Sequence, residues 1–182
     1  MMKLWLCMCL LGSLAFAKLN TVVSIVPQKS FVEAIGGEFV NVEVMVLPGK
    51  DPHSYEPKPS QMKAIGEAKL YFTIGIEFEE AWMKKFKNQN KTIKIVDSSA
   101  GIKKLEMKEH DHKEEKGHDS HKHGGLDPHV WTSPENIKVI AKNIFDALVA
   151  EDSVHQEQYK ANYLKLLEKI DATNAKIKEL LK

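Results

Sequence analysis

Apolar and polar positions in the first hundred residues form four short strand-like segments, and longer segments with helical spacing separate them. Alternating and β-branched residues predict strands at residues 21–26, 40–47, 70–74 and 92–96. Helices are predicted between these strands, at residues 27–35, 59–68 and 78–87. Strands and helices that alternate at this spacing favour an α/β fold, in which a parallel sheet is flanked by helices.

The last fifty residues have helical periodicity throughout. One helix is predicted from Pro134, with Ser133 as its N-cap. A second helix starts at Asp152 or Ser153 and would be roughly 45 Å long, at about 1.5 Å per residue. The core stripe predicted for this second helix consists of Val154, Ala161, Leu164, Leu167, Ile170, Ile177 and Leu181.

The predicted length of the last helix suggests a linker between two lobes. It exceeds the usual helix of one compact domain, and neither Gly nor Pro ends it before Lys182. We therefore expect residues 151–182 to form a long linking helix that leads into a second lobe outside this sequence. The alternative is a C-terminal helix with a frayed end. Residues 18–150 are expected to form one α/β lobe.

The first seventeen residues have the pattern of a secretory signal peptide. Met1-Met2-Lys3 is a short positive start, residues 4–16 are apolar, and Ala15-Phe16-Ala17 fits a cleavage site. The apolar run is shorter than the roughly 20 residues that span a bilayer. We therefore expect residues 1–17 to be removed and the chain to be exported to the periplasm. The alternatives are a retained anchor and lipidation at Cys7 or Cys9.

Composition limits the chemistry that the mature chain can perform. The sequence of 182 residues is 43% hydrophobic and 28% charged, which is typical of a globular domain. Its net charge is +1 and its Lys residues are scattered, so nothing indicates a nucleic-acid partner. Both cysteines lie in the predicted signal peptide, so a metal site in the mature chain must use imidazole and oxygen donors.

Two copies of the tripeptide Asp-Pro-His are the strongest candidates for chemistry. His53 follows the second predicted strand, at the edge of an open α/β sheet where ligands bind. His129 stands in the segment Asp127-Pro128-His129-Val130-Trp131. The proline stiffens each loop before the imidazole is presented. Asp127 is placed to orient the ring through its second N–H, and Trp131 is placed to shield the site from water.

We interpret His53 and His129 as two ligands of one transition-metal site. Both motifs are interpreted as following strands, and strand ends in one sheet converge. Tetrahedral zinc needs further donors, and the sequence offers candidates without placing them: Asp51, Glu56 and Asp127. His155 lies on the last helix, outside its clear core stripe, and we interpret it as a solvated residue.

A segment of different composition, residues 103–125, precedes the second motif. It contains Lys, Glu, His, Asp and Gly with almost no large apolar residue, so it is predicted to be a mobile loop. Its histidines are irregularly spaced, at His110, His112, His118, His121 and His123. Such spacing favours weak, exchangeable capture of Zn²⁺, Cu²⁺ or Ni²⁺. The alternative is an inert polar linker.

Together these features resemble the metal-binding substrate-binding proteins of ABC transporters, and most of all their zinc-uptake branch. The resemblance rests on the signal peptide, Asp-Pro-His-Ser-Tyr-Glu-Pro at 51–57, the acidic His-rich loop, and Asp-Pro-His-Val-Trp followed by Ser-Pro-Glu-Asn. It covers essentially the whole mature chain, but only the N-terminal half of such a protein. It implies two α/β lobes joined by a long helix, with the metal in the cleft between them.

The resemblance also implies ligands and a function. His53 and His129 match the family's first two metal ligands, whereas its other two, a His and an acidic residue, lie in the second lobe and have no counterpart here. The implied protein is a periplasmic receptor, not an enzyme, that captures Zn²⁺ and delivers it to a membrane permease. Alternatives are a receptor for Mn²⁺ or another divalent metal, an adhesin of the same family, and a secreted zinc hydrolase. A hydrolase needs a carboxylate base beside a metal-bound water, and the sequence has no His-Glu-x-x-His motif.

Overall fold

A computed structural model describes residues 17–51, 54–106 and 126–182. The predicted signal peptide lies outside these residues, except for Ala17. The described strands are β1 (Leu19–Val23), β2 (Val40–Val44), β3 (Leu70–Thr73) and β4 (Lys94–Asp97). The described helices are α1 (Val26–Gly36), α2 (Pro59–Glu67), α3 (Glu77–Gln89), α4 (Pro134–Glu151) and α5 (Gln156–Leu180). Short 3-10 segments occur at Gly37–Phe39, Val130–Thr132 and Ser153–His155.

All neighbouring strands of the sheet are parallel, as the sequence predicts. Their order is β2-β1-β3-β4, and Thr21 of β1 lies opposite Val42 on one side and Leu70 on the other. The strand order therefore reverses between β1 and β3, because β2 extends the sheet beyond β1 and β4 extends it beyond β3. In open α/β sheets, ligands bind beside the carboxyl ends of the strands at such a reversal.

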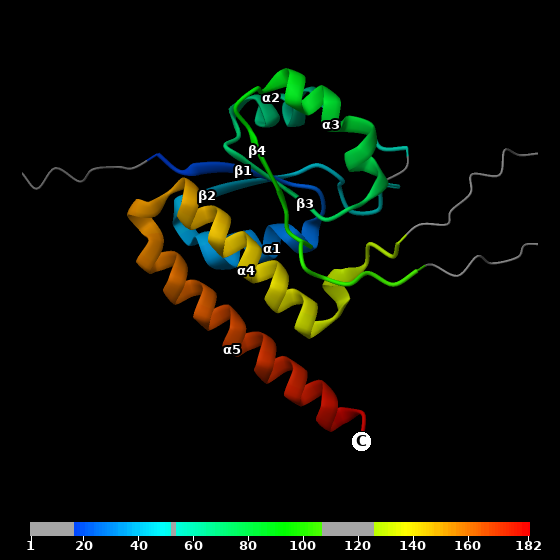
Figure 1. Ribbon diagram of the computed structural model, residues 1–182, viewed down its shortest axis with the longest axis vertical. Helices are drawn as coiled ribbons and strands as arrows, with labels where there is room; N and C mark the ends of the chain where they lie inside the picture. The colour runs from blue at the N-terminus through cyan, green and yellow to red at the C-terminus, as the bar shows by residue number, and fades with distance from the viewer. Residues whose placement is uncertain (1–16, 52–53, 107–125) are drawn as a thin grey trace, which may run out of the picture.

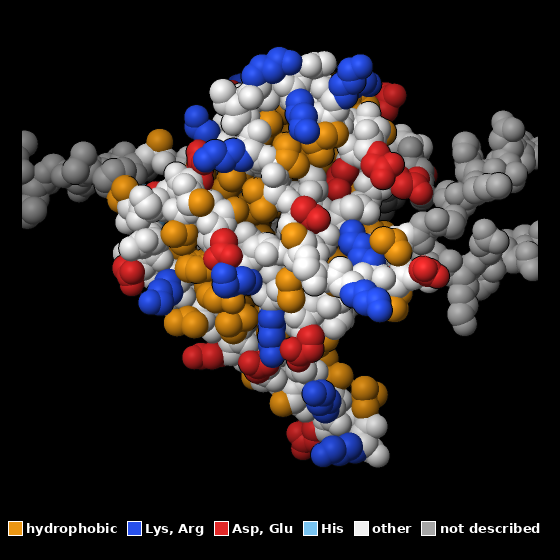
Figure 2. Space-filling view, in the orientation of Figure 1, with side chains coloured by type: hydrophobic (Ala, Val, Ile, Leu, Met, Phe, Trp, Pro, Cys, Tyr) orange, Lys and Arg blue, Asp and Glu red, His pale blue; other side chains and the backbone are white. Residues whose placement is uncertain are grey.

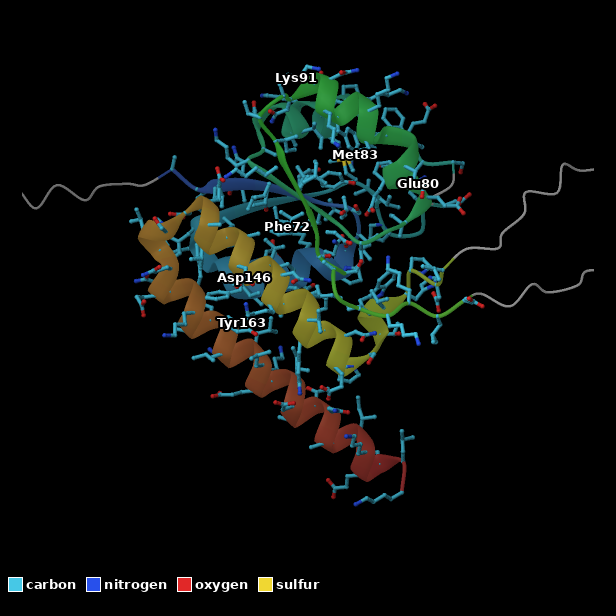
Figure 3. The ribbon with its side chains drawn as sticks, in the orientation of Figure 1. Phe72, Glu80, Met83, Lys91, Asp146 and Tyr163 are labelled. Carbon is cyan, nitrogen blue, oxygen red and sulfur yellow. The ribbon has the colours of Figure 1, made fainter. Side chains whose placement is uncertain are left out.

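Helices cover both faces of the sheet (Figure 1). Helices α2 and α3 pack together on one face, α1 and α4 cover the other, and α5 lies outside them against α1 and α4. Figure 3 shows Phe72 of β3 in the middle of this arrangement, between the two helical layers. The predicted α/β fold, with a parallel sheet flanked by helices and a long C-terminal helix, is confirmed.

Aromatic and aliphatic side chains from both layers form a core around the sheet. Tyr71, Phe72, Phe78 and Phe86 are almost inaccessible to solvent. The rings of Tyr71 and Phe86 meet edge to face, with their centroids 5.6 Å apart. Full burial of each large apolar side chain stabilises a fold by about 1.5–3 kcal/mol. This core fixes the strands whose carboxyl ends anchor the segment that leads to the first Asp-Pro-His motif.

The last helix is shorter than predicted and packs through a different face. Helix α5 spans 25 residues. Tyr159 and Ile170 are buried, and Tyr163 stacks on Phe145 of α4 with ring centroids 4.9 Å apart; Figure 3 labels Tyr163. The predicted core stripe was wrong, because five of its seven members are exposed: Val154, Ala161, Leu164, Ile177 and Leu181. The prediction followed aliphatic residues, whereas two tyrosines one turn apart begin the packed face.

The surface carries charges of both signs. Figure 2 shows Lys and acidic side chains interspersed over the face that α3, α4 and α5 present to the viewer. Within the described part of the chain, no helix combines the length and apolar character needed to cross a membrane.

Candidate metal centre

The segment that precedes His53 is tied to the carboxyl edge of the sheet. Strand β2 ends at Val44, three residues earlier than predicted. The next two residues still pair with β1, since Met45 N–H donates to Val23 C=O and Val46 N–H to Ser24 C=O, each at 2.9 Å. The segment that leads to the first Asp-Pro-His motif therefore starts at the strand ends, and the position predicted for His53 itself lies outside the described residues.

Residues 52 and 53 lie outside the described residues, but their flanks are anchored. On one side, Ser54 Oγ donates to Asp51 Oδ2 at 3.1 Å. On the other, Tyr55 is 9% exposed, and its hydroxyl donates to Gln61 Oε1 at 2.8 Å. Gln61 Nε2 in turn donates to Val44 C=O at 2.6 Å and to Met45 C=O at 2.7 Å. The buried tyrosine and glutamine thus fasten this motif to the end of β2.

His129 lies at the entrance to α4 and not at the end of a sheet strand, so that part of the prediction was wrong. Strand β4 ends at Asp97. The chain reaches the second motif through an isolated antiparallel bridge between Glu106 and Leu126. The Asp127 N–H then donates to Leu105 C=O at 2.7 Å. His129 is therefore placed by the two segments that bracket residues 107–125.

Asp127 orients the His129 ring as predicted. Asp127 Oδ1 lies 2.9 Å from the backbone nitrogen of His129 and 2.7 Å from its Nδ1. The backbone hydrogen bond from His129, followed by the hydrogen bond from its ring, lowers the pKa of Asp127 below its usual range. An ionised carboxylate only accepts hydrogen bonds, so Nδ1 is the donor, and in the neutral imidazole the lone pair that a metal needs is on Nε2.

The His129 imidazole is open to solvent on one side and covered on the other. Its side chain is 63% exposed. The Trp131 ring lies 5.1 Å from it, centroid to centroid, at an interplanar angle of 50°. Trp131 is itself half-buried against the core. The tryptophan therefore shields one face of the ring, as predicted, and leaves the imidazole accessible to an ion.

A buried polar cluster beneath the carboxyl ends of β1 and β3 was missed by sequence reasoning. Ser24 Oγ contacts Tyr71 Oη at 2.8 Å and donates to Glu79 Oε1. Backbone N–H groups of Ile74 and Gly75 donate to the two oxygens of Glu79 at 2.8 Å each. Burial raises the pKa of Glu79, although these hydrogen bonds oppose the shift. Burial and the neighbouring carboxylate also raise the pKa of Tyr71.

Gln28 joins three strand ends and was also missed. Its Oε1 accepts from Ser24 N–H at 3.0 Å and from Ile25 N–H at 3.2 Å. Its Nε2 donates to Phe72 C=O and Thr73 C=O, each at 3.1 Å. Only one signal was available in the sequence: a polar residue in the first turn of the helix after a buried strand. That position does not reveal the partners of Nε2 at Phe72, Thr73 and Ser98, which lie 44 to 70 residues away.

The remaining predicted residues have different outcomes. The five histidines of the loop lie outside the described residues. Among the residues that are described, no group of three or more His, Cys, Asp and Glu could hold a metal ion. A depression of about 610 Å³ lies at the opposite, amino end of β1 and β2, and it shares no residue with the candidate site. A complete metal site thus needs ligands beyond His129 and Asp127.

His155 is not the solvated residue that was predicted. Its side chain is 12% exposed, and its Nδ1 lies 2.7 Å from Asp152 Oδ2. Its ring stacks on Phe39 with the centroids 4.1 Å apart. Tyr159 donates to the same Asp152 oxygen at 2.6 Å. His155 therefore belongs to a packed corner between α4 and α5, and the nearby sequence does not indicate its contact with Phe39.

Comparison with known proteins connects this geometry to metal uptake. The zinc-binding lipoprotein AdcA of Streptococcus pneumoniae is 33% identical over 165 residues, which are 87% of this chain and 32% of AdcA. The manganese ABC transporter substrate-binding lipoprotein PsaA of Streptococcus anginosus is 33% identical over 153 residues, which are 80% of this chain and 46% of PsaA. A crystal structure of ZnuA superposes with a TM-score of 0.78 at 37% identity, and the match covers 91% of this chain and 59% of that one.

These comparisons identify the family and also show how much of a relative this sequence represents. The chain spans about half the length of the curated relatives it matches first. Residues 21–182 match the family described as "Zinc-uptake complex component A periplasmic". The chain therefore belongs to this family, among the metal-binding substrate-binding proteins of ABC transporters.

Proposed function

We propose that this chain supplies one lobe of an extracytoplasmic zinc receptor, and that His53 and His129 are two of the ligands that capture Zn²⁺. The orientation of His129 carries this proposal. Its Nδ1 is held by Asp127, its ring is exposed, and Nε2 has its lone pair available. An oriented imidazole with a carboxylate behind it is the usual arrangement of a histidine that binds metal in proteins.

The other ligands would come from a second lobe. Family resemblance assigns a His and an acidic residue to that lobe, and this chain spans only about half of its first matched relatives. Helix α5, with 25 residues, would link the lobes. The receptor would then release its ion to a membrane permease. The predicted signal peptide, residues 1–17, would direct the protein to the periplasm.

Donor chemistry supports zinc over manganese. Imidazole suits Zn²⁺, whereas Mn²⁺ favours sites made of carboxylates, carbonyls and water. Both proposed ligands from this chain are imidazoles, and the His-rich tract of residues 107–125 supplies more. We propose that its five histidines collect zinc weakly near the site. Manganese is the second candidate, because PsaA, named for manganese, is as similar to this chain as AdcA, named for zinc.

Calorimetric titration of residues 18–182 with Zn²⁺ tests the proposal through two variants. The first carries His53→Ala together with His129→Ala. The second lacks residues 107–123, so that Gly124-Gly125 closes the turn between the bridged residues Glu106 and Leu126. We expect the double substitution to remove the tightest site and the deletion to remove only weak sites. Unchanged tight binding in the double variant would contradict the proposal.

A further inference from the structure

Lys104 joins two segments that both lie between His53 and His129 in the sequence. It is half-buried and belongs to the segment that runs from β4 toward the His-rich tract. Its Nζ donates to Ile74 C=O at 2.9 Å. Ile74 directly follows β3 and precedes α3. Lys104 therefore connects the segment that leads to the second Asp-Pro-His motif with the residue that follows β3. It is not one of the proposed ligands.

The peptide group that Lys104 contacts is held from both sides. The carbonyl of the Ile74–Gly75 peptide accepts from the Lys104 ammonium, and the N–H of the same peptide donates to Glu79 Oε2 at 2.8 Å. The bond from the Lys104 ammonium involves a charged group, and such bonds are shorter and stronger than neutral ones. Lys104 and Glu79 thus clamp one peptide between them.

Glycine at position 75 makes this clamp possible. The φ angle of Gly75 is +86°, which side-chain-bearing residues rarely adopt. A Cβ atom at this position would also overlap Lys104 Nζ. The turn after β3 therefore needs glycine both for its backbone conformation and for the approach of the lysine.

The Glu79 side of this clamp is held by further buried groups. Glu79 lies in the first turn of α3, accepts from Ser24 Oγ and from the Ile74 N–H, and Ser24 contacts the Tyr71 hydroxyl. Ser24, Glu79 and Tyr71 are all buried. Lys104 is thereby connected to the carboxyl ends of β1 and β3, where the strand order reverses.

On the Lys104 side, the clamp is connected to His129 through Leu105 and Asp127. Leu105, next to Lys104, accepts the Asp127 N–H at 2.7 Å. Asp127 Oδ1 then holds the backbone and the ring of His129. In Figure 1 the segment after β4 and the segment before α4 run to the same side of the molecule, where both continue into the part drawn in grey.

We propose that Lys104 is a positioning residue for the metal site, fixing the His129 imidazole relative to the carboxyl edge of the sheet through Leu105 and Asp127. This inference rests on the proposed function, because it concerns the same imidazole. Lys104 contacts neither the metal nor the ring. It acts by fixing the position of the antiparallel bridge between Glu106 and Leu126, which directly precedes the second motif.

A purely electrostatic effect of Lys104 has the opposite sign. Removing a positive charge near a cation site should strengthen metal binding if charge alone matters. Removing a positioning contact should weaken binding, because the imidazole is no longer presented in one place. The sign of the change in zinc affinity therefore separates the two explanations.

Nuclear magnetic resonance of the full chain provides the test, with Zn²⁺ as the ligand and the ring signals of His129 as the reporter. Lys104→Met should weaken the zinc dissociation constant at His129 by about tenfold, at the lower end of what loss of a supporting partner costs a metal site. Lys104→Arg, which keeps a cation and its reach, and Lys103→Met, a control at an exposed neighbouring lysine, should each stay within about twofold of the original. Hydrogen exchange at the Asp127 amide should accelerate in Lys104→Met only.

The outcomes are distinct. Unchanged or tighter zinc binding in Lys104→Met would overturn the inference. If that variant fails to fold, Lys104→Gln keeps a donor without the charge and is expected to weaken binding in the same direction; wild-type affinity in it would also overturn the inference. His53→Ala with His129→Ala lacks the reporter ring, so it is titrated in parallel by calorimetry. If this double variant binds zinc normally, the proposed function fails; if only Lys104→Met does, the positioning role alone fails.

Discussion

One carboxylate oxygen of Asp127 holds His129 at two points, 2.9 Å from its backbone nitrogen and 2.7 Å from its ring Nδ1. The two contacts fix the direction of the imidazole before any ion arrives. The residue between them is Pro128, which restricts the backbone of the same loop. A loop of three residues thus presents one nitrogen outward in a defined orientation.

Removing this carboxylate should weaken zinc binding without unfolding the chain. We expect Asp127→Ala to lower zinc affinity by about 10- to 100-fold, the usual effect of losing such a partner. Asp127→Asn keeps an oxygen acceptor and should lose less. Competition titration against a coloured chelator measures both. Asp146→Ala is the control, since Asp146 is an exposed partner of Lys142 on α4. Wild-type affinity in Asp127→Ala would show that His129 does not need this support.

Glu79 should make the stability of the chain depend on pH. Burial raises its pKa above the ordinary value of 4.5, so the folded chain favours the protonated form. The stability contributed by protonated Glu79 is therefore full below pH 4.5 and is lost as pH rises through the raised pKa. Urea unfolding across this range should show the decline.

Glu79→Gln isolates this effect. The amide replaces one acceptor by a donor that faces backbone N–H groups, which should cost about 1–3 kcal/mol at any pH. The amide does not titrate. The difference in the free energy of unfolding between this variant and the original chain should therefore be largest at and below pH 4.5, and it should shrink as pH rises. Glu80→Gln is the control, because Glu80 is an exposed neighbour, labelled in Figure 3. A deficit that stays constant with pH would count against this account.

Much of the fold could be predicted because its determinants are local. The β-branched and alternating segments predict the four described strands, although three of the four begin or end two or three residues from the predicted positions. Pro27, Pro59 and Pro134 lie in the first turns of α1, α2 and α4, where the missing N–H costs nothing. The orienting role of Asp127 could also be predicted, since it needs only the spacing of two residues.

Several of the contacts that were missed join residues far apart in sequence. Gln28 reaches Ser98 across 70 positions, and Ser24 reaches Glu79 across 55. Phe39 covers His155 although neither residue has a local reason to be buried. No periodicity or spacing encodes such pairs, since they depend on how strand ends and helix starts meet. The polar support of the candidate site is of this kind, whereas its proposed ligands stand in a short local motif.

The corner between α4 and α5 should lose stability when Asp152 is changed. Burial would raise the pKa of Asp152, but hydrogen bonds from Tyr159 and His155 outweigh it and lower that pKa below its usual range. Asp152→Ala removes both partners and should cost about 1–3 kcal/mol. In the original chain, this stability is present above the ordinary pKa of 3.8 and is lost as pH falls through the lowered value.

Urea unfolding at neutral pH measures the change at Asp152. Asp171→Ala is a matched control, because the Asp171 side chain is 60% exposed and its ion pair with Lys138 of α4 is of a kind that contributes little. If Asp152→Ala unfolds at the same urea concentration as this control, the packed corner contributes nothing measurable to the fold.

Zinc should protect the folded chain more than manganese does. An ion that binds only the folded state adds about 2.7 kcal/mol at a concentration 100 times its dissociation constant. Imidazole ligands favour Zn²⁺ over Mn²⁺, so at equal concentrations Zn²⁺ should raise the thermal midpoint further. The chain without residues 107–123 is the sample of choice, because metal bound by the five histidines of that tract in the unfolded chain would reduce the effect. A chelator should return the midpoint to its metal-free value, and His53→Ala with His129→Ala should abolish the shift. Greater protection by Mn²⁺ would favour the manganese receptor, because the site in this lobe would then bind Mn²⁺ more tightly than Zn²⁺.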